Sequence, residues 1–218
     1  MCGRYTLSTD DDRLIANRFD VGDFPPLART LLHRFNVCPG EQVLAVDATR
    51  RARPLKWGLA GPGDKSPAPI NARSETVASK PLFASLVEGA GGRCLVPADG
   101  WYEWQRSEKR GPRPAPFRYT VDGGALFAFA AIHARGFLAV LTTTPNEVCA
   151  RIHDRMPVVL AGPEAEAAWL DPDVDAADMA ELMVPLDARR VSVAPASTRV
   201  NRAGVEGPEL LLAEPTLF

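Results

Sequence analysis

Short runs of alternating hydrophobic and polar residues recur along most of the chain, and glycine or proline ends many of them. This period of two residues is typical of β-strands. The pattern predicts eight strands, over residues 43–47, 54–57, 93–97, 101–105, 117–121, 125–132, 137–142 and 158–160.

Other segments have helical periodicity. Thr9 and the aspartates after it indicate a helix start, with Ile15 and Phe19 on the apolar stripe of that helix. Thr144 and Glu147 form a capping box with proline at the first helical position, which predicts a helix from there to about residue 152. Further helices are expected over 81–87, 164–170 and 176–183.

Length and composition fit one globular domain. The chain has 218 residues, 46% of them hydrophobic, so it can bury a core of its own. No internal repeat is visible, and the Pro/Gly-rich stretches 61–69 and 111–116 are too short to be interdomain linkers. We predict a single α+β domain over residues 1–218, with a C-terminal tail from about residue 199. Its many short strands form a curled, barrel-like sheet with inserted helices.

The cysteines exclude a disulfide framework and a structural metal. Cys2, Cys38, Cys94 and Cys149 lie far apart, without a CxxC pair or the Cys/His spacing of a zinc module. We therefore expect no metal, no cofactor and a reduced, cytoplasmic setting. No signal region is visible, and the longest apolar stretch, 125–133, is far too short to span a membrane, so a soluble, unanchored protein is expected.

Charge is distributed unevenly, although the formal net charge is only −2. Residues 106–118 include five basic side chains and one acidic one, whereas residues 161–188 include eight acidic side chains and no Lys or Arg. The basic segment could contact a polyanion that the acidic segment repels. Two solvated loops of opposite sign are the alternative.

Cys2 is the candidate nucleophile, because it directly follows the initiating methionine. Removal of Met1 would leave an α-amine with a reference pKa of about 7.7–8.0 beside a thiol near 8.5. Such an aminothiol condenses with an aldehyde to an imine, which the thiol closes to a five-membered thiazolidine. A cysteine at this position by chance is the alternative, and a retained Met1 would block the amine.

Three further segments contain polar groups in unusual places. Glu103 shares a strand face with Trp101, so it is either a general acid/base with a raised pKa or an edge residue between aromatic anchors. His153 lies between a helix end and a strand, where its side chain either points into a cleft or has a structural role. Asn71 and Arg73 are two residues apart on an extended segment, where Asn71 could make a hydrogen bond and Arg73 a phosphate contact on the same side. The alternative is that Asn71 forms a turn and Arg73 is an ordinary surface arginine.

Together these segments resemble the SRAP family, the SOS response-associated peptidases that process abasic sites in DNA. Six blocks carry the resemblance in order along nearly the whole chain. They are residues 1–5, 34–40, 57–59, 70–76, 93–104 and 152–157.

The resemblance implies a mechanism. In the family, the mature N-terminal cysteine forms a thiazolidine with the C1′ aldehyde of an abasic deoxyribose in single-stranded DNA. Cys2 would supply both nucleophiles, Glu103 would act as proton shuttle, and His153 would assist sugar ring opening and later reversal. Asn71 would hold the backbone or amine of Cys2. The same cysteine and glutamate are implied to remove Met1, which makes the chain a cysteine-dependent autopeptidase with a crosslinking, lyase-type activity.

The resemblance also implies a set of DNA contacts. Arg4 and Arg73 would grip phosphates beside the lesion, and Asn36 would build the pocket floor or touch the DNA backbone. Trp57 and Arg155 complete the expected DNA-binding set. The partner would be single-stranded DNA containing abasic sites, bound by a monomer at the nucleoid without cofactor, metal or membrane.

The chain departs from the family pattern at three places. The second tryptophan expected after Trp57, near residues 61–63, is absent. A family-like Ser-x-x-Val-Asn is present at 197–201, but Val205 and Glu206 replace the Asn-Asp that follows it. These two changes affect the expected DNA contacts more than the chemistry. Cys38 replaces a small residue and is interpreted as a core substitution.

Two other functions fit the same residues. A plain thiol peptidase or amidohydrolase would use Cys2 with His153, and would cleave peptides other than its own Met1–Cys2 bond. A non-catalytic nucleic-acid binding module would fit the missing tryptophan, but it would need neither Cys2 nor Glu103.

Overall fold

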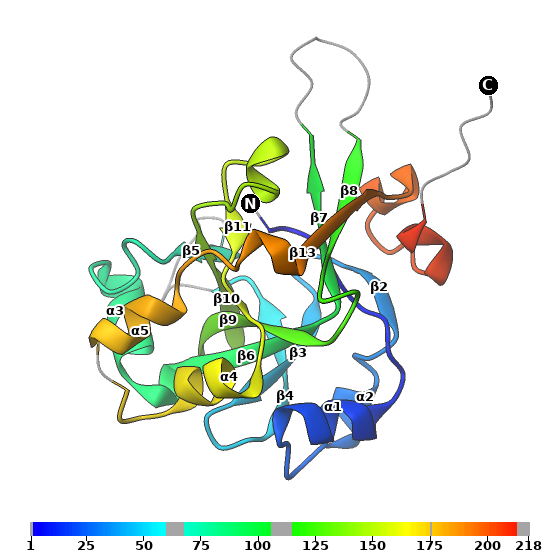
Figure 1. Cartoon of the computed structure of the whole chain (residues 1–218). Coiled ribbons are helices and arrows are strands. Elements are labelled where there is room, and N and C mark those ends of the chain that lie inside the picture. Colours follow the sequence, from blue (N-terminus) through cyan, green and yellow to red (C-terminus); the bar gives the residue numbers. More distant parts are fainter. Residues whose placement is uncertain (1, 60–67, 106–114, 175, 213–218) are drawn as a thin grey trace, which may run out of the picture.

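The structure is a computed structural model that describes residues 2–59, 68–105, 115–174 and 176–212. It is a mixed α+β domain built on two sheets (Figure 1). The predicted α+β fold with a curled, barrel-like sheet is confirmed.

Five strands of the larger sheet close into a barrel. Each is hydrogen-bonded to the next in the order β10, β4, β3, β6, β9, and β9 pairs back with β10. The strands are β3 (Gln42–Asp47), β4 (Ala52–Trp57), β6 (Arg93–Ala98), β9 (Phe127–Ala134) and β10 (Phe137–Thr143). Every residue of β6 is buried, as are residues 127–132 of β9, so these strands form the centre of the core.

Three short strands extend this sheet beyond the barrel. β5 (Asn71–Arg73) pairs in parallel with β10, and β11 (Met156–Pro157) pairs with β10 in the antiparallel sense. β12 (Val159–Leu160) pairs with β9. The C-terminal end of β10 therefore brings together the segments that contain Asn71 and the residues just before β11.

The second sheet has five antiparallel strands in the order β13, β8, β7, β1, β2. They are β1 (Tyr5–Leu7), β2 (Arg34–Val37), β7 (Gly100–Trp104), β8 (Pro116–Val121) and β13 (Val191–Pro195). Only Asp99 separates β6 from β7, so the chain passes directly from the barrel into this sheet. The Asp99 carboxylate accepts hydrogen bonds from Thr6, Ser8 and Arg118, which fixes the crossing point.

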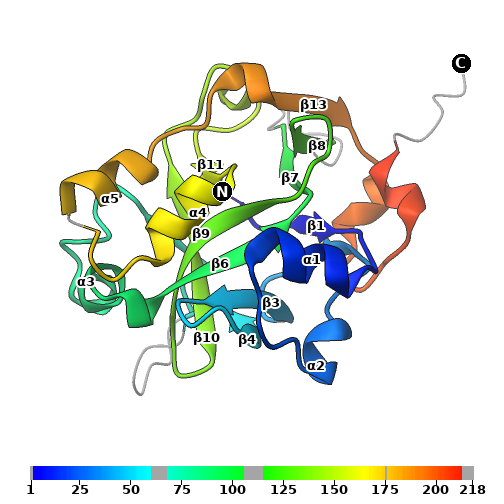
Figure 2. The same cartoon turned by 60° about the horizontal axis from the view of Figure 1, so that its bottom comes forward.

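Helices cover the outside of the barrel (Figure 2). They are α1 (Asp12–Phe19), α2 (Pro26–Arg29), α3 (Pro81–Glu88), α4 (Pro163–Leu170) and α5 (Ala176–Leu182). Short 3₁₀ turns follow at η1 (Ala90–Gly92), η2 (Cys149–Arg151), η3 (Ala188–Arg190), η4 (Thr198–Asn201) and η5 (Pro208–Leu211). α4 packs against β6, and the buried Trp169 donates from its Nε1 to the Cys94 carbonyl at 3.1 Å. None of the described helices is long and apolar enough to cross a membrane.

One helix prediction needs correction. The helix predicted from the Thr144 capping box is wrong, because this segment forms only the 3₁₀ turn η2. There the Asn146 side-chain oxygen accepts from the Cys149 N–H at 2.9 Å, and this local hydrogen bond stabilises a short turn instead of a longer helix. The helix start predicted at Thr9 and the aspartates after it is confirmed, because the Asp11 carboxylate caps the first backbone N–H groups of α1.

Candidate active site

Cys2 lies buried just before β1, and its backbone is held from β5. The Asn71 side-chain amide donates to the Cys2 carbonyl oxygen at 2.9 Å, which agrees with the expectation that Asn71 holds this backbone. Burial raises the pKa of the Cys2 thiol well above its usual range, and the negative charge of Glu103 adds to the increase. The backbone N–H of Arg4 acts in the opposite direction and lowers the pKa.

The register between β1 and β7 places Glu103 beside Cys2. Tyr5 lies opposite Trp101, and the Tyr102 N–H donates to the Arg4 carbonyl at 2.9 Å. Continued by one step, this antiparallel register puts Glu103 opposite the Cys2–Gly3 segment. The sharing of one strand face by Trp101 and Glu103, expected from alternation, is consistent with their burial toward the main core.

Glu103 has the electrostatics of a general acid/base. Its side chain is almost fully buried, and this burial raises the pKa of Glu103 to about 7. The negative charge of Asp154 acts in the same direction. A carboxyl group with a pKa near neutrality can both donate and accept a proton under physiological conditions.

His153 and Asp154 belong to the loop between η2 and β11. The His153 Nδ1 atom lies 2.9 Å from an Asp154 carboxylate oxygen and 3.1 Å from the Arg155 backbone nitrogen. The His153 side chain is 12% exposed, whereas that of Asp154 is 81% exposed. Because the Asp154 charge acts on the pKa of Glu103, this loop lies near the Glu103 carboxyl group. The site therefore combines residues from the segment before β1, from β5 and β7, and from this loop.

Arg4 is held from three directions. One guanidinium nitrogen donates to the Asn36 side-chain oxygen at 2.8 Å and also to the Val200 carbonyl oxygen. The guanidinium also lies over the Trp104 ring, 5.9 Å from its centroid. Arg4 is thus a partly buried, anchored cation beside the nucleophile.

Arg73 and Arg155 differ in exposure. Arg73 is exposed at the end of β5, on the same side of the strand as Asn71 by alternation. Arg155 makes a two-point ion pair with Glu75 and donates to the Thr142 carbonyl at 2.6 Å. Only Arg73 of this pair is therefore placed with its side chain open to a phosphate.

The expected contact of Trp57 with DNA needs correction, and the burial of Asn36 fits the pocket floor rather than the DNA backbone. Trp57 is 1% exposed, its indole N–H donates to the Ile70 carbonyl at 2.9 Å, and its ring packs edge-on against Tyr5. Asn36 is fully buried and donates to the carbonyls of Arg202 and Val205. Because neither side chain reaches the surface, both support the site from behind.

Several features noted in the sequence have a structural role or lie outside the described residues. In the acidic stretch, Glu166 is buried and forms an ion pair with Arg18. Cys38 is buried, as expected for a core substitution. Residues 60–67, where the second tryptophan is missing, and 106–114, most of the basic segment, lie outside the described residues.

Sequence reasoning missed a buried polar group behind Glu103. Tyr119 stacks on Trp101 with ring centroids 5.0 Å apart, and neither the Tyr119 hydroxyl nor the Trp101 indole N–H has a hydrogen-bond partner in the described structure. Burial raises the pKa of Tyr119 above its usual range, and the charges of Cys149 and Glu103 contribute, so the hydroxyl lies near both groups. No signal in the sequence singles out Tyr119, which reads as an ordinary strand residue.

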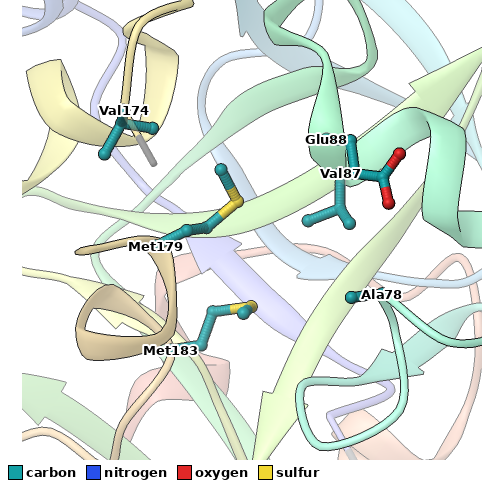
Figure 3. Close-up of a pocket in the computed structure, with 6 residues that line it drawn as sticks. All are labelled: Ala78, Val87, Glu88, Val174, Met179 and Met183. Atoms are coloured by element: carbon teal, nitrogen blue, oxygen red, sulfur yellow. The ribbon is translucent and has the colours of Figure 1, made fainter. Parts of the chain in front are cut away.

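A cavity of about 190 Å³ lies elsewhere, between α3 and α5 (Figure 3). Its lining is almost entirely apolar, with Met179 and Met183 on one side and Val87 on the other. None of its lining residues belongs to the candidate site. In the described part of the chain, no cluster of three His, Cys, Asp or Glu side chains has the arrangement of a metal site.

Comparison with known proteins agrees with this arrangement. The family model for SOS response associated peptidase (SRAP) matches residues 1–203. The chain belongs to the SRAP family. The family assignment made from the six sequence blocks is therefore confirmed.

Members of the SRAP family from several organisms are similar over the whole chain or a large part of it. Abasic site processing protein YoaM of Bacillus subtilis is 36% identical over 231 residues, covering 98% of this chain and 99% of YoaM. YedK of Escherichia coli, also named an abasic site processing protein, is 35% identical over 229 residues, covering 97% of this chain and 99% of YedK. HMCES of Xenopus tropicalis is 31% identical over 73% of this chain and 56% of HMCES.

Solved structures show the same fold. A protein from Bacteroides thetaiotaomicron superposes with a TM-score of 0.86 at 21% identity, covering 98% of this chain and all of the other. A phage-related protein from Bordetella bronchiseptica superposes with a TM-score of 0.67 at 29% identity, covering 90% and 95%.

Proposed function

We propose that this SRAP protein processes abasic sites in single-stranded DNA by forming a covalent thiazolidine through Cys2. The observation that carries the proposal is the buried Glu103, with its pKa near 7, beside the backbone of Cys2. The names of the relatives, which are abasic site processing proteins, support the substrate class.

The first step is loss of Met1 by hydrolysis of the Met1–Cys2 bond. Asn71 holds the Cys2 carbonyl group through the hydrogen bond to its oxygen. Glu103 accepts a proton from the Cys2 thiol, which attacks the Met1 carbonyl carbon, and returns a proton to the departing Cys2 amine. Water then releases methionine from the thiol, so that one water is consumed and a free aminothiol remains.

The second step is condensation with the lesion. An abasic deoxyribose opens to a C1′ aldehyde, assisted by His153, and the Cys2 amine attacks that carbon. Glu103 protonates the departing hydroxyl group, which leaves as water and gives the imine. The Cys2 thiol then adds to the imine carbon, transferring its proton through Glu103 to the nitrogen, and the thiazolidine closes.

The raised pKa of the Cys2 thiol favours this chemistry over that of a general thiol peptidase. A general peptidase keeps its thiol ionised for incoming peptides, whereas burial keeps the Cys2 thiol protonated until Glu103 accepts its proton, which is enough for a single cleavage of the adjoining Met1–Cys2 bond. In the condensation the amine attacks first, and the thiol adds only after the imine has formed. A non-catalytic binding module is also disfavoured, because a buried carboxyl group such as Glu103 adds a desolvation cost without serving DNA binding.

The decisive experiment is intact mass spectrometry of the purified protein with and without an abasic oligonucleotide. The wild type should lack Met1 and form a one-to-one adduct that survives heating without a reductant. Produced behind a cleavable tag that exposes the amine of residue 2, Cys2→Ser keeps the amine but cannot close the ring, so it should leave at most an imine that requires borohydride to be trapped. A heat-stable Cys2→Ser adduct formed without reductant would exclude the thiazolidine.

DNA is expected to reach the site mainly through phosphate contacts, with Arg73 as an exposed cation beside Asn71. Each phosphate contact with a single strand contributes about 0.7 to the slope of log affinity against log salt concentration. Arg73→Ala should therefore weaken noncovalent binding of an unmodified strand and flatten this slope by roughly 0.7. An unchanged slope in a fluorescence anisotropy titration would remove Arg73 from the DNA interface.

A further inference from the structure

The C-terminal residues 197–212 lie against β2 and β7, on the side of the second sheet away from the barrel (Figure 1). Val200 and Leu210 are fully buried there against Phe35 and Tyr102. The SRAP family model ends at residue 203, so part of this segment lies beyond the region that it matches. Its polar contacts lead from Glu206 to the nucleophile.

Glu206 binds the edge strand β2. One carboxylate oxygen accepts from the backbone N–H groups of Phe35 at 2.6 Å and Asn36 at 3.0 Å. The other accepts from the Arg34 guanidinium at 2.7 Å. The carboxylate thus satisfies two N–H groups of the edge strand and pairs with a cation at the same time.

The next contacts join Asn36 to Arg4. The Asn36 amide donates to the carbonyls of Arg202 and Val205, both at 3.0 Å, so the segment fixes this side chain. Its oxygen is thereby directed toward the Arg4 guanidinium, which lies 2.8 Å away and also donates to the Val200 carbonyl.

The last contacts are made by the Arg4 backbone. Its carbonyl accepts from the Tyr102 N–H at 2.9 Å, which pairs the segment after Cys2 with β7. A second connection runs beside it, because the Trp104 indole donates to the Asn201 side chain at 2.6 Å next to Glu103. The position of Arg4 therefore sets the pairing that aligns Glu103 with Cys2, which is two residues before Arg4.

We propose that Glu206 is a positioning residue of the active site, which acts through β2, Asn36 and Arg4 to hold Cys2 and Glu103 in their relative positions. The kinetic consequence rests on the proposed function, whereas the structural consequence does not. Small displacements of reacting groups reduce rates strongly, so a residue that touches no substrate can still control the reaction.

Glu209 provides a matched control. It lies three residues further along the chain and also forms an ion pair, with Arg199 at 2.9 Å. Both side chains of that pair are about half exposed, and its carboxylate contacts neither β2 nor Arg4 among the described contacts. Glu209→Gln removes a C-terminal carboxylate without touching the connection to Cys2.

The structural arm measures amide hydrogen exchange without DNA, in wild type, Glu206→Ala, Glu206→Gln and Glu209→Gln. Glu206→Ala should speed exchange at Phe35 and Asn36, and also at Arg4 and Tyr5. Glu206→Gln keeps one acceptor oxygen and should show a smaller effect at the same amides, and Glu209→Gln should match wild type. Faster exchange in β2 with unchanged exchange at Arg4 and Tyr5 would overturn the proposal.

The kinetic arm measures adduct formation at limiting and saturating abasic DNA. Glu206→Ala should lower the maximal rate by about ten- to a hundredfold. The half-saturating DNA concentration should change little. Glu206→Gln should have a maximal rate between those of Glu206→Ala and wild type, and Glu209→Gln should have the wild-type rate. Wild-type maximal rates in both Glu206 variants would also overturn the proposal. A wild type that forms no adduct would contradict the proposed function instead, and the exchange result would still decide the role of Glu206.

Discussion

The two faces of β7 contain similar side chains but differ in how their polar atoms are satisfied. On the face covered by the C-terminal segment, the Tyr102 hydroxyl donates to the Phe35 carbonyl at 3.0 Å and the Trp104 indole donates to Asn201. On the face toward the barrel, the Trp101 indole N–H and the hydroxyl of the neighbouring Tyr119 have no partner in the described structure.

This difference fits a supporting role for the face covered by the C-terminal segment and the proposed reactive role for the face toward the barrel. Buried polar groups are normally paired, because leaving them unpaired costs free energy. The face that contains Glu103 bears this cost, and the apolar surroundings are what bring its pKa near 7. The face covered by the C-terminal segment holds the strand in place, and the proposed chemistry lies on the opposite face.

The test with the largest expected effect is Glu103→Gln, which nearly preserves the shape of the side chain on the face toward the barrel. It should slow adduct formation by about 10²–10⁴-fold, because the proton shuttle is lost. The variant should be produced behind a cleavable tag that leaves Cys2 at the N-terminus, so that failure to remove Met1 does not block the amine. A wild-type rate in quenched time courses would exclude Glu103 from the mechanism.

The pH dependence of stability gives the next largest effect. Because the folded protein raises the pKa of Glu103 from 4.5 to about 7, its contribution to stability is fully present below pH 4.5 and is lost as pH rises through 7. The free energy of unfolding should therefore be about 3 kcal/mol lower above pH 7 than below pH 4.5. Chemical denaturation at several pH values should show this loss in wild type and not in Glu103→Gln. Parallel curves for the two proteins would contradict the burial of this charge.

A Tyr→Phe substitution should have different effects on the free energy of unfolding on the two faces of β7. Tyr102→Phe removes a satisfied hydrogen bond and strands the Phe35 carbonyl, so it should lower the free energy of unfolding by about 1–2 kcal/mol. Tyr119→Phe removes a hydroxyl group without a partner and should leave stability unchanged or raise it by up to about 1 kcal/mol. Urea unfolding of both variants is the measurement, and equal losses would show that the two faces do not differ as described.

The barrel was the more predictable part of the fold. The strands around residues 43–47, 93–97 and 125–132 follow clear alternation or apolar runs, and the structure contains strands at these positions. β1 and β5 were missed because each has only three residues, too few to show a period, and both depend on distant partner strands. The helix expected after Thr144 failed because Asn146 offers the backbone a competing local hydrogen bond.

Motifs in the sequence indicated which side chains are chemically capable, but not which way they face. Cys2, Asn71 and Glu103 come together as expected. Trp57 was expected at the DNA, yet it packs against Tyr5. Asn36 was expected at the pocket floor or at the DNA backbone, and the C-terminal segment encloses it. The contacts of Glu206 could not be predicted either, because they are made with backbone N–H groups of β2, about 170 residues earlier.

The wide separation in sequence of the residues around Cys2 has a consequence for biosynthesis. Asn71 is 69 residues from Cys2, and the Thr6–Asp99 contact that aligns β1 with β7 spans 93 residues. Contacts of such separation form late, after the intervening chain has been made and collapsed. Cys2 of a nascent chain therefore remains unburied on the ribosome until β7, which ends at Trp104, and the strands that support it have emerged. Enclosure of Cys2 thus becomes a sign that about the first half of the chain, at least, has been translated and has folded.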